Sequence, residues 1–390
     1  LFLTQHRASI MLNLEETTYA SVIIDNGTES IKVGLAGDEA PRQVIPTLIG
    51  YSQYSALDIV MDRTNYSIGA SAYNKRGLLD VKRPIVNRRI EDFDAMEKIW
   101  HHILLKSLKI DTSQNSVLLT QSCEYTDEDR RKIAEIFFEF FNTPSIYMGN
   151  QGMLGLFATG STKGVALDSG EGGTHVVPVY EGYVSPYSIN SIDVSGHNIT
   201  EHLHNLLTQK GLTFSKHYDF DIVKNIKENK CFVSMDYERE LKEFIENANT
   251  KDAIYELPDS EKININKEQI EAPEIMFQPQ MIGRPEFGVG ELIYKSYFSI
   301  DTEIRNSLFE NIVLVGGNTL FNNFPERLCN NIKSFGGNSV DFKVHAPAER
   351  KYTPWIGGSI LSCLTPFEGM WVTKKEYEEH GADIINIKSF

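Results

Sequence analysis

Two short glycine-rich segments constrain the fold of this 390-residue chain more than any other feature. Val22–Gly37 and Gly164–Val179 each contain an apolar run with β-branched residues, an aspartate, a glycine-rich turn and a second apolar run. This order predicts a β-hairpin, because glycine gives a tight turn the backbone freedom that it needs. The two segments begin about 140 residues apart, which favours a duplicated fold with one hairpin in each half.

The tips of such hairpins can bind phosphate, because their successive N–H groups point into one small space. Asp25 and Asp168 would repel a phosphate directly, so we expect them to face a hydrated divalent cation. Either hairpin alone would be an ordinary part of an α/β core. The presence of both, at matching positions in two halves, favours a nucleotide held between the halves.

The composition is that of an ordinary globular protein, with 41% hydrophobic and 23% charged residues. The length suits two to three domains or one large two-lobed unit. A net charge of −15 argues against a general nucleic-acid or anionic-membrane binder, because neutralising phosphates requires a basic surface. No apolar run of about 18 residues occurs, so no membrane span is expected. The cysteines are scattered without C-x-x-C pairing and indicate reduced thiols of a cytosolic protein: Cys123, Cys231, Cys329 and Cys363.

Strands alternate with helices in both halves, which predicts an α/β architecture. Thr126 and Asp129 fit a capping box at the start of one helix. Residues 47–77 lack helical periodicity and predict a small, mobile appendage. Residues 150–159 predict a helix despite Gly152 and Gly155, which cost about 1 kcal/mol each in a helix interior and therefore need close packing or a hinge.

Six longer segments, together with the two hairpins, resemble the actin family. The hairpins are similar to those of the ATPase superfamily that actin shares with sugar kinases and heat-shock ATPase chaperones. The resemblance covers about residue 12 to the C-terminus without a large insertion. The six segments follow one another in the family's order: MEKIWHH (Met96–His102), FFEFFNTPSIY (Phe137–Tyr147), VYEGY (Val179–Tyr183), YELPD (Tyr255–Asp259), ERKYTPWIGGSILSCL (Glu349–Leu364) and MWVTKKEYEEHG (Met370–Gly381).

The resemblance implies an actin-like ATPase fold of the α/β class, with two related α/β domains around a nucleotide cleft. Each domain would divide into two subdomains. Residues 1–19 would be an N-terminal extension. The subdomain boundaries implied are 20–46, 84–158 and 351–390 for subdomain 1, 47–83 for subdomain 2, 159–194 and 284–350 for subdomain 3, and 195–283 for subdomain 4.

The resemblance also implies the cofactors, ATP or ADP with Mg²⁺ or Ca²⁺, and the residues that bind them. The first loop would hold the β-phosphate through Asp25, Gly27, Thr28 and Lys32. The second loop would hold the γ-phosphate and the sugar through Asp168, Ser169, Gly170, Glu171 and Gly172. Asp25 and Asp168 would hold the metal through water. The adenosine pocket would be lined by Lys227, Glu228, Gly316, Gly317, Asn318 and Lys351. Gln151 and His175 would be the catalytic residues that orient water in a weak, assembly-coupled ATPase.

The chain departs from the family pattern at several of these places. Glu29 replaces a glycine of the first loop and would add repulsion at the phosphate tip unless it turns outward. Asn87 replaces the family's modified histidine, and Glu171 replaces an aspartate. Residues 51–66, where the family inserts a mobile segment into the next filament subunit, are almost wholly different. Four apolar residues between positions 57 and 61 would form an apolar plug or belong to a divergent surface loop.

Three functional hypotheses follow from the sequence. The leading one is an ATP-binding cytoskeletal protein that assembles head to tail into filaments, with nucleotide state controlling assembly. The second is a non-polymerising actin-related subunit of a dynein- or dynactin-like, ciliary or chromatin complex. The third, a small-molecule kinase, is disfavoured because no separate sugar-binding motif is present. Expected partners are the chain itself, other actin-family subunits, and actin-binding or motor-complex proteins, without direct nucleic-acid binding. The expected location is the cytoplasmic cytoskeleton, with a cilium as one setting.

Overall fold

A computed structural model describes residues 20–52, 65–212, 218–246, 253–257, 260–336 and 342–389. All structural statements below refer to these residues. The N-terminal extension 1–19 and the apolar residues at 57–61 lie outside them.

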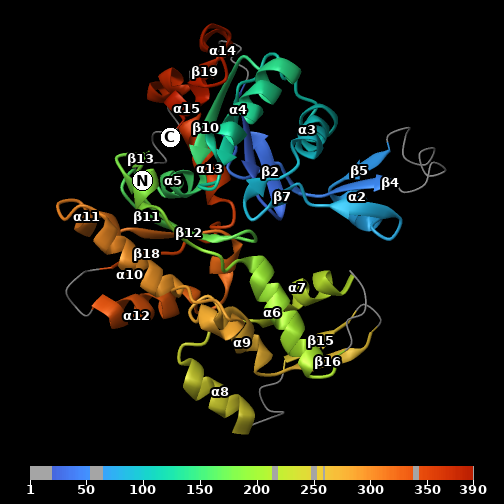
Figure 1. Ribbon diagram of the computed structural model, residues 1–390, viewed down its shortest axis with the longest axis vertical. Helices are drawn as coiled ribbons and strands as arrows, with labels where there is room; N and C mark the ends of the chain where they lie inside the picture. Colours follow the sequence, from blue (N-terminus) through green and yellow to red (C-terminus); the bar gives the residue numbers. More distant parts are fainter. Residues whose placement is uncertain are drawn as a thin grey trace.

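The first sheet is built on the first predicted hairpin (Figure 1). Across the sheet the strands are β19 (Val372–Thr373), β10 (Ser145–Asn150), β9 (Val117–Gln121), β1 (Val22–Asn26), β2 (Ser30–Leu35) and β3 (Gln43–Pro46). Strands β1 and β2 pair antiparallel, with Asp25 opposite Lys32. Strand β9 runs parallel to β1, and β10 runs parallel to β9. All five residues of β1 are buried, as expected for a strand in the middle of a covered sheet.

The second sheet repeats this arrangement around the second predicted hairpin. Its strands are, in order, β13 (Tyr183–Val184), β12 (Thr174–Tyr180), β11 (Gly164–Ser169), β17 (Ile312–Val315) and β18 (Val344–His345), with β14 (Asn190–Ile192) also paired to β12. Strands β11 and β12 are antiparallel, whereas β17 and β18 continue the sheet in parallel. Both hairpins and the duplication predicted from them are therefore confirmed.

Two helices join the sheets, and they lie between them in Figure 1. Helix α13 (Thr353–Leu361) packs on β1 and β9, while α5 (Gln151–Phe157) packs on β11, β12 and β17. The close packing predicted at the two α5 glycines is confirmed. A Cβ on Gly152 would lie 2.8 Å from the Cβ of Val177, and one on Gly155 would lie 2.6 Å from Val315 Cγ2.

Helices cover the outer face of the first sheet. They enclose a core that includes the fully buried Trp100 and Phe137. The predicted capping box is confirmed, because Thr126 and Asp129 exchange their side-chain and backbone hydrogen bonds. The helices are α3 (Phe93–His101) with its π-helical continuation His102–Ser107, α4 (Asp127–Glu135) with its continuation Ile136–Phe140, α14 (Lys374–His380) and α15 (Ile384–Lys388).

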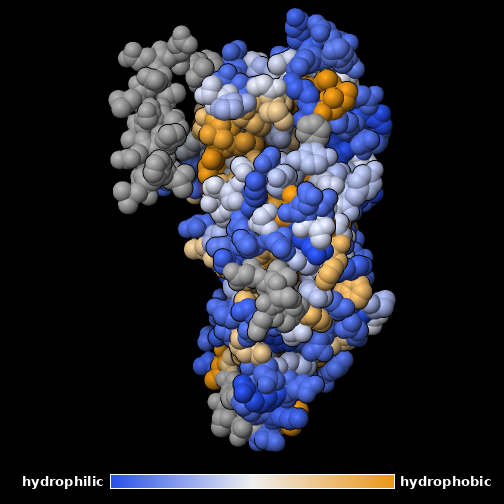
Figure 2. All heavy atoms as spheres, turned by 90° about the vertical axis from the view of Figure 1, so that its left-hand side faces the viewer, coloured by the Kyte–Doolittle hydropathy of each residue, from blue (hydrophilic) through white to orange (hydrophobic). Residues whose placement is uncertain are grey.

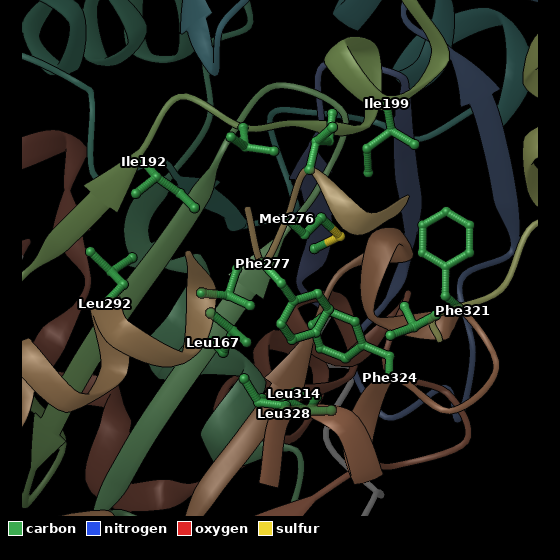
Figure 3. Close-up of a cluster of buried hydrophobic side chains, with 14 of the residues drawn as sticks. Leu167, Ile192, Ile199, Met276, Phe277, Leu292, Leu314, Phe321, Phe324 and Leu328 are labelled. Carbon is green, nitrogen blue, oxygen red and sulfur yellow. The ribbon is translucent and has the colours of Figure 1, made fainter. Parts of the chain in front are cut away.

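The second sheet packs against a larger helical layer. Figure 3 shows part of this core, where Leu167 and Leu314 of the sheet approach Phe277 and Phe324. The helices are α6 (Gly196–Gln209), α7 (Tyr218–Lys230), α8 (Tyr237–Glu246), α9 (Glu268–Glu274), α10 (Val289–Ser299), α11 (Arg305–Phe309) and α12 (Phe324–Gly336). The hairpin of β15 (Ala253–Glu256) and β16 (Lys262–Ile265) lies beyond α6 and α7 (Figure 1). Short 3₁₀ helices occur at Pro186–Ser188, Pro279–Ile282, Gly317–Leu320 and Thr365–Met370.

The appendage predicted over residues 47–77 contains regular structure in its described part. Strands β4 (Ile49–Ser52), β5 (Tyr66–Ile68) and β6 (Leu79–Lys82) form a sheet with β4 in the middle, and α2 (Ala70–Asn74) packs beside it. It projects beside the first sheet in Figure 1. Strands of three or four residues are too short to give a clear periodicity, which is why the sequence does not reveal them.

On the face drawn in Figure 2, hydrophilic residues dominate and apolar residues gather in separate patches. In the described part of the chain no helix combines the length and the apolar character needed to cross a membrane. All four cysteines are free thiols, as their spacing predicts.

Candidate functional site

A cavity of about 470 Å³ lies between the tips of the two duplicated hairpins. Its volume is in the range of small-molecule sites, roughly 300–1,000 Å³. The structure brings most of the sequence-predicted site residues together in its lining: Asp25, Gly27, Thr28, Lys32, Gln151, Asp168, Gly170, Glu171, Gly172, Lys227, Glu228, Gly316, Gly317, Asn318 and Lys351. Ser169 and His175 are the two predicted residues that are not part of this lining.

The first hairpin places a buried, fully bonded carboxylate at the cavity. Asp25 Oδ2 lies 3.0 Å from the Lys32 ammonium directly across the hairpin. Its Oδ1 accepts hydrogen bonds from the Thr120 hydroxyl at 2.7 Å and from the Gln151 amide at 3.0 Å. The Gln151 side chain is therefore held in one orientation beside Asp25, at the first residue of α5.

The second hairpin uses Ser169 as an internal support. Ser169 is fully buried, and its hydroxyl lies 2.7 Å from the hydroxyl of Thr174. The Asn318 amide donates to Ser169 Oγ at 3.1 Å and to the Gly170 carbonyl at 2.8 Å. Ser169 thus fixes Asn318 against the loop from within the sheet.

Gly316 makes a close backbone approach that only glycine permits. Its φ is +90°, and a Cβ there would lie 2.2 Å from the carbonyl oxygen of Ser169. A Cβ on Gly317 would meet no atom within 4 Å, so this residue lies open to the cavity. The strand β17 therefore delivers bare backbone to one wall of the site.

Arg88 is a cavity residue that the sequence reasoning missed. Asn87 and Arg88 form the two-residue turn between β7 (Ile85–Val86) and β8 (Arg89–Ile90), with φ values of +45° and +64°. Positive φ at both positions is typical of a type I′ hairpin turn. The local signal for this turn is an asparagine that follows the apolar pair Ile85–Val86. Nothing in the sequence indicates that the side chain of Arg88 points inward.

The Arg88 guanidinium binds the loop of the second hairpin. Its Nη1 donates to Asp168 Oδ2 at 2.7 Å, and its Nη2 donates to the carbonyl of Gly173 at 3.0 Å and to that of Asp168 at 3.4 Å. Burial raises the pKa of Asp168, but the charge and hydrogen bond of Arg88 outweigh it and hold this pKa below its usual range. Asp168 therefore stays ionised, with its charge already compensated.

His175 is paired with a second residue that the sequence did not single out, Glu124. The His175 Nε2 and a Glu124 carboxylate oxygen lie 2.8 Å apart. Burial lowers the pKa of His175, and repulsion from Arg88 lowers it further, while Glu124 raises it by a smaller amount. The other ring nitrogen, Nδ1, is buried and has no hydrogen-bond partner among the described residues.

On the opposite wall, Lys227 is almost fully buried. Its ammonium donates to the Gly196 carbonyl at 2.9 Å and lies 3.7 Å from Glu171 Oε2. Burial lowers the pKa of Lys227 despite the nearby Glu171 carboxylate. The other two predicted charged residues of this region, Glu228 and Lys351, are exposed at the rim.

Glu29 lines the cavity and pairs with two basic side chains, which compensate the negative charge expected to repel a phosphate. It forms ion pairs with Lys224 of α7 and, at 3.0 Å, with Arg83 beyond β6. Burial raises the pKa of Glu29, but both basic groups lower it, with a net lowering. Nearby, Asp221 of α7 lies 3.7 Å from Arg76. We call these three contacts the cleft-mouth ion pairs.

The lining is chemically suited to a polyphosphate. It combines five carboxylates with five basic side chains, although the whole chain carries a net charge of −15. The Thr28 hydroxyl and the Asn26 amide nitrogen are buried at the cavity without a hydrogen-bond partner among the described residues. Such unpaired polar atoms cost free energy unless a ligand or water satisfies them. The residues present therefore fit a nucleotide together with a hydrated cation.

The sequence was compared with models of known protein families, and one of them matches. The family model described as Actin matches residues 16–390, which is nearly the whole chain.

Proposed function

The chain belongs to the actin family, and on this premise we propose that it is an ATP-binding cytoskeletal protein that assembles head to tail into filaments under nucleotide control. The observation that carries the proposal is the cavity between the tips of two topologically equivalent hairpins. A ligand that contacts both tips stabilises one relative orientation of the two halves. A head-to-tail contact that does not close into a ring then propagates that orientation as a helical filament.

The proposed binding roles follow from the contacts of the lining. The N–H groups of the two glycine-rich tips, with Lys32, would hold the phosphates, and the backbone at Gly316 and Gly317 would lie against the sugar and base. A divalent cation near Asp25 would supply charge compensation for the phosphates when bound. The fixed Gln151 amide would orient water in a weak ATPase. The four subdomains would have the boundaries that the resemblance implies.

The first test measures assembly and turnover together. The purified chain, with ATP and Mg²⁺, is centrifuged over a concentration series while phosphate release is recorded. We expect a critical concentration above which protein pellets, with phosphate release that follows assembly. Protein that binds ATP yet stays in the supernatant at every concentration would contradict filament formation.

A matched pair of glutamine variants separates turnover from assembly. Gln151→Ala removes the amide that Asp25 holds at the cavity, whereas Gln209→Ala changes an exposed glutamine at the end of α6. We expect slower phosphate release in the first variant by about 10²-fold or more and no change in the second. Equal rates in both variants would remove Gln151 from the proposed mechanism.

A second candidate, a non-polymerising subunit of a larger complex, is favoured by one observation. Arg88 binds the second loop, and one of the cleft-mouth ion pairs joins Glu29 of the first loop to α7, in both cases through the chain's own charges. Such a chain would retain its closed form with little need for turnover. Stoichiometric co-purification with other proteins, in the absence of pelleting, would support this candidate over the first.

A further inference from the structure

Arg88 stands out because it adds a fixed cation to the phosphate region of the site. Its guanidinium is nearly buried, with a side-chain exposed fraction of 8%. A Cβ on Gly170 would lie 3.3 Å from Arg88 Nη2, and one on Gly172 would lie 2.9 Å from the Arg88 backbone nitrogen. Both glycines belong to the loop expected to hold the γ-phosphate. The cation therefore lies against that loop and lines the cavity.

The guanidinium is also rigidly positioned. Three acceptors on the loop, one carboxylate oxygen of Asp168 and the carbonyls of Asp168 and Gly173, hold its two terminal nitrogens. A guanidinium has five N–H groups in a planar fork that suits phosphate oxygens as well as carboxylates. Because contacts with the loop already order this side chain, a phosphate that reaches it meets a preorganised donor.

Two buried polar atoms without partners among the described residues belong to residues near Arg88. The buried Nδ1 of His175 has no partner among the described residues, and a Cβ on Gly173 would lie 3.5 Å from both Arg88 Nε and the His175 ring. On the other side, the Thr28 hydroxyl, also buried without a partner among the described residues, would lie 2.4 Å from a Cβ on Gly172. Of these two residues, only Thr28 lines the cavity, so its unsatisfied hydroxyl is the one that indicates a place for an anionic oxygen or a water of the site.

The Arg88–Asp168 pair reduces the negative charge that is available to attract a metal ion at the site. A hydrated divalent cation is attracted to a carboxylate by its uncompensated charge. Asp168 is already neutralised by Arg88 at 2.7 Å, and Asp25 is neutralised by Lys32 at 3.0 Å. Both carboxylates that are expected to hold the metal are thus already paired with basic side chains of the protein. Of these basic side chains, Arg88 lies against the second loop, where the phosphates are expected to bind.

We propose that Arg88 is a built-in cation of the phosphate site that takes over part of the charge compensation of the divalent metal, so that this chain binds ATP with little dependence on a divalent cation. The inference rests on the proposed ATP binding. Arg88 would then determine how strongly the site distinguishes ATP with a bound divalent cation from ATP without one. It involves no covalent step, because the guanidinium acts only as a hydrogen-bond donor and a positive charge.

The test is the affinity for ATP with excess Mg²⁺ and with excess EDTA, measured by isothermal titration calorimetry on the full chain. Arg88→Gly removes the cation and suits the positive φ of the turn, and Arg88→Lys keeps the charge without the fork. The matched control is Arg89→Gln, which changes the neighbouring exposed arginine paired with Asp129. Thermal unfolding without nucleotide reports whether each variant is folded.

We expect the wild type and Arg89→Gln to lose less than about tenfold in affinity when EDTA replaces Mg²⁺. Arg88→Gly should lose at least about tenfold more than the wild type, and Arg88→Lys should fall between them. Equal losses in the wild type and Arg88→Gly would overturn the inference while leaving ATP binding intact. No ATP binding by the wild type in either condition would overturn the proposed function itself. If Arg88→Gly does not fold, a wild-type loss above about tenfold, or a loss in Arg88→Lys equal to that of the wild type, overturns the inference.

Discussion

At the scale of single residues, the backbone at Gly316 is the most tightly determined point of the site. Both its φ of +90° and its approach to the Ser169 carbonyl exclude a side chain. We therefore expect Gly316→Ala to lower the free energy of unfolding by about 2 kcal/mol or more, from a strained φ and a forced backbone shift. Chemical denaturation measures the change.

The neighbouring glycine provides the control for that substitution. Gly317→Ala adds the same methyl group where no atom lies within 4 Å. Its effect should stay within about 0.5 kcal/mol, as for a surface substitution. Equal destabilisation by both changes would mean that the close approach at Gly316 is not the cause.

The buried His175 should make stability depend on pH. Its pKa in the folded protein lies below the ordinary value of about 6.5, chiefly because it is buried. As the pH falls below about 6.5, the unfolded chain takes up the proton first, so the free energy of unfolding decreases until the folded pKa is reached. Above about pH 6.5 this loss is absent.

Two histidine variants test this sign. Urea denaturation at about pH 7.5 and pH 5.5 should show a smaller acid-induced loss of stability for His175→Gln than for the wild type. His380→Gln, at the exposed C-terminal end of α14, should behave like the wild type. An unchanged acid-induced loss in His175→Gln would show that His175 titrates normally in the folded protein.

At the scale of elements, the cleft-mouth ion pairs connect α7 to the first hairpin and to the segment around β6. Glu29 contributes one carboxylate to both Lys224 and Arg83. Partly exposed ion pairs contribute about 0.2–1 kcal/mol each. Glu29→Gln should therefore speed the dissociation of bound ATP by about two- to tenfold, because opening the cleft breaks these pairs. Stopped-flow release of a fluorescent ATP analogue measures this rate.

Asp80→Asn is the matched control for Glu29→Gln. Asp80 lies on β6, pairs with Lys82 at 3.6 Å, and is more than half exposed outside the cavity lining. Its removal should leave the dissociation rate unchanged. If both variants release the analogue at the wild-type rate, the ion pairs do not hold the cleft closed.

In the helices that cover the first sheet, some features can be predicted from local sequence signals and others cannot. The capping box at Thr126 is readable in the sequence because both partners lie within four residues. The π-helical ends of α3 and α4 cannot be predicted from the sequence, because these widened turns continue regular helices without a local sequence signal of their own.

At the scale of the whole molecule, α5 and α13 connect two sheets whose hairpin tips share one cavity. A ligand that binds only the folded chain stabilises it by RT ln(1 + [L]/Kd), about 2.7 kcal/mol at one hundred times Kd. We expect ATP to raise the unfolding temperature by this mechanism, measured by differential scanning calorimetry.

Adenosine at the same concentration should raise the unfolding temperature much less, because it lacks the phosphates that we propose the tips of both hairpins bind. An equal shift with adenosine and ATP would mean that the two hairpin tips contribute little to binding. No shift with either would contradict nucleotide binding at this cavity.

The hairpins, the duplication and the family could all be predicted from the amino-acid sequence, because each depends on short runs of neighbouring residues. Glycine-rich turns between apolar strands specify Val22–Gly37 and Gly164–Val179 locally, and the family motifs recur in order along the chain. The glycines of α5 likewise predicted close packing or a hinge, since their cost in a helix interior needs a reason, and the structure shows close packing.

The side chains that meet in the cavity could not be predicted from the sequence, because they come from distant parts of the chain. Arg88 and Asp168 are 80 residues apart, and Glu124 and His175 are 51 residues apart, so no local pattern joins them. From the sequence, Glu29 was expected to repel a bound phosphate. Its basic partners, on α7 and just after β6, are distant in the sequence and come close only in the folded chain. The physical reason is that backbone propensity acts between neighbours, whereas charge pairing and burial depend on distances in space.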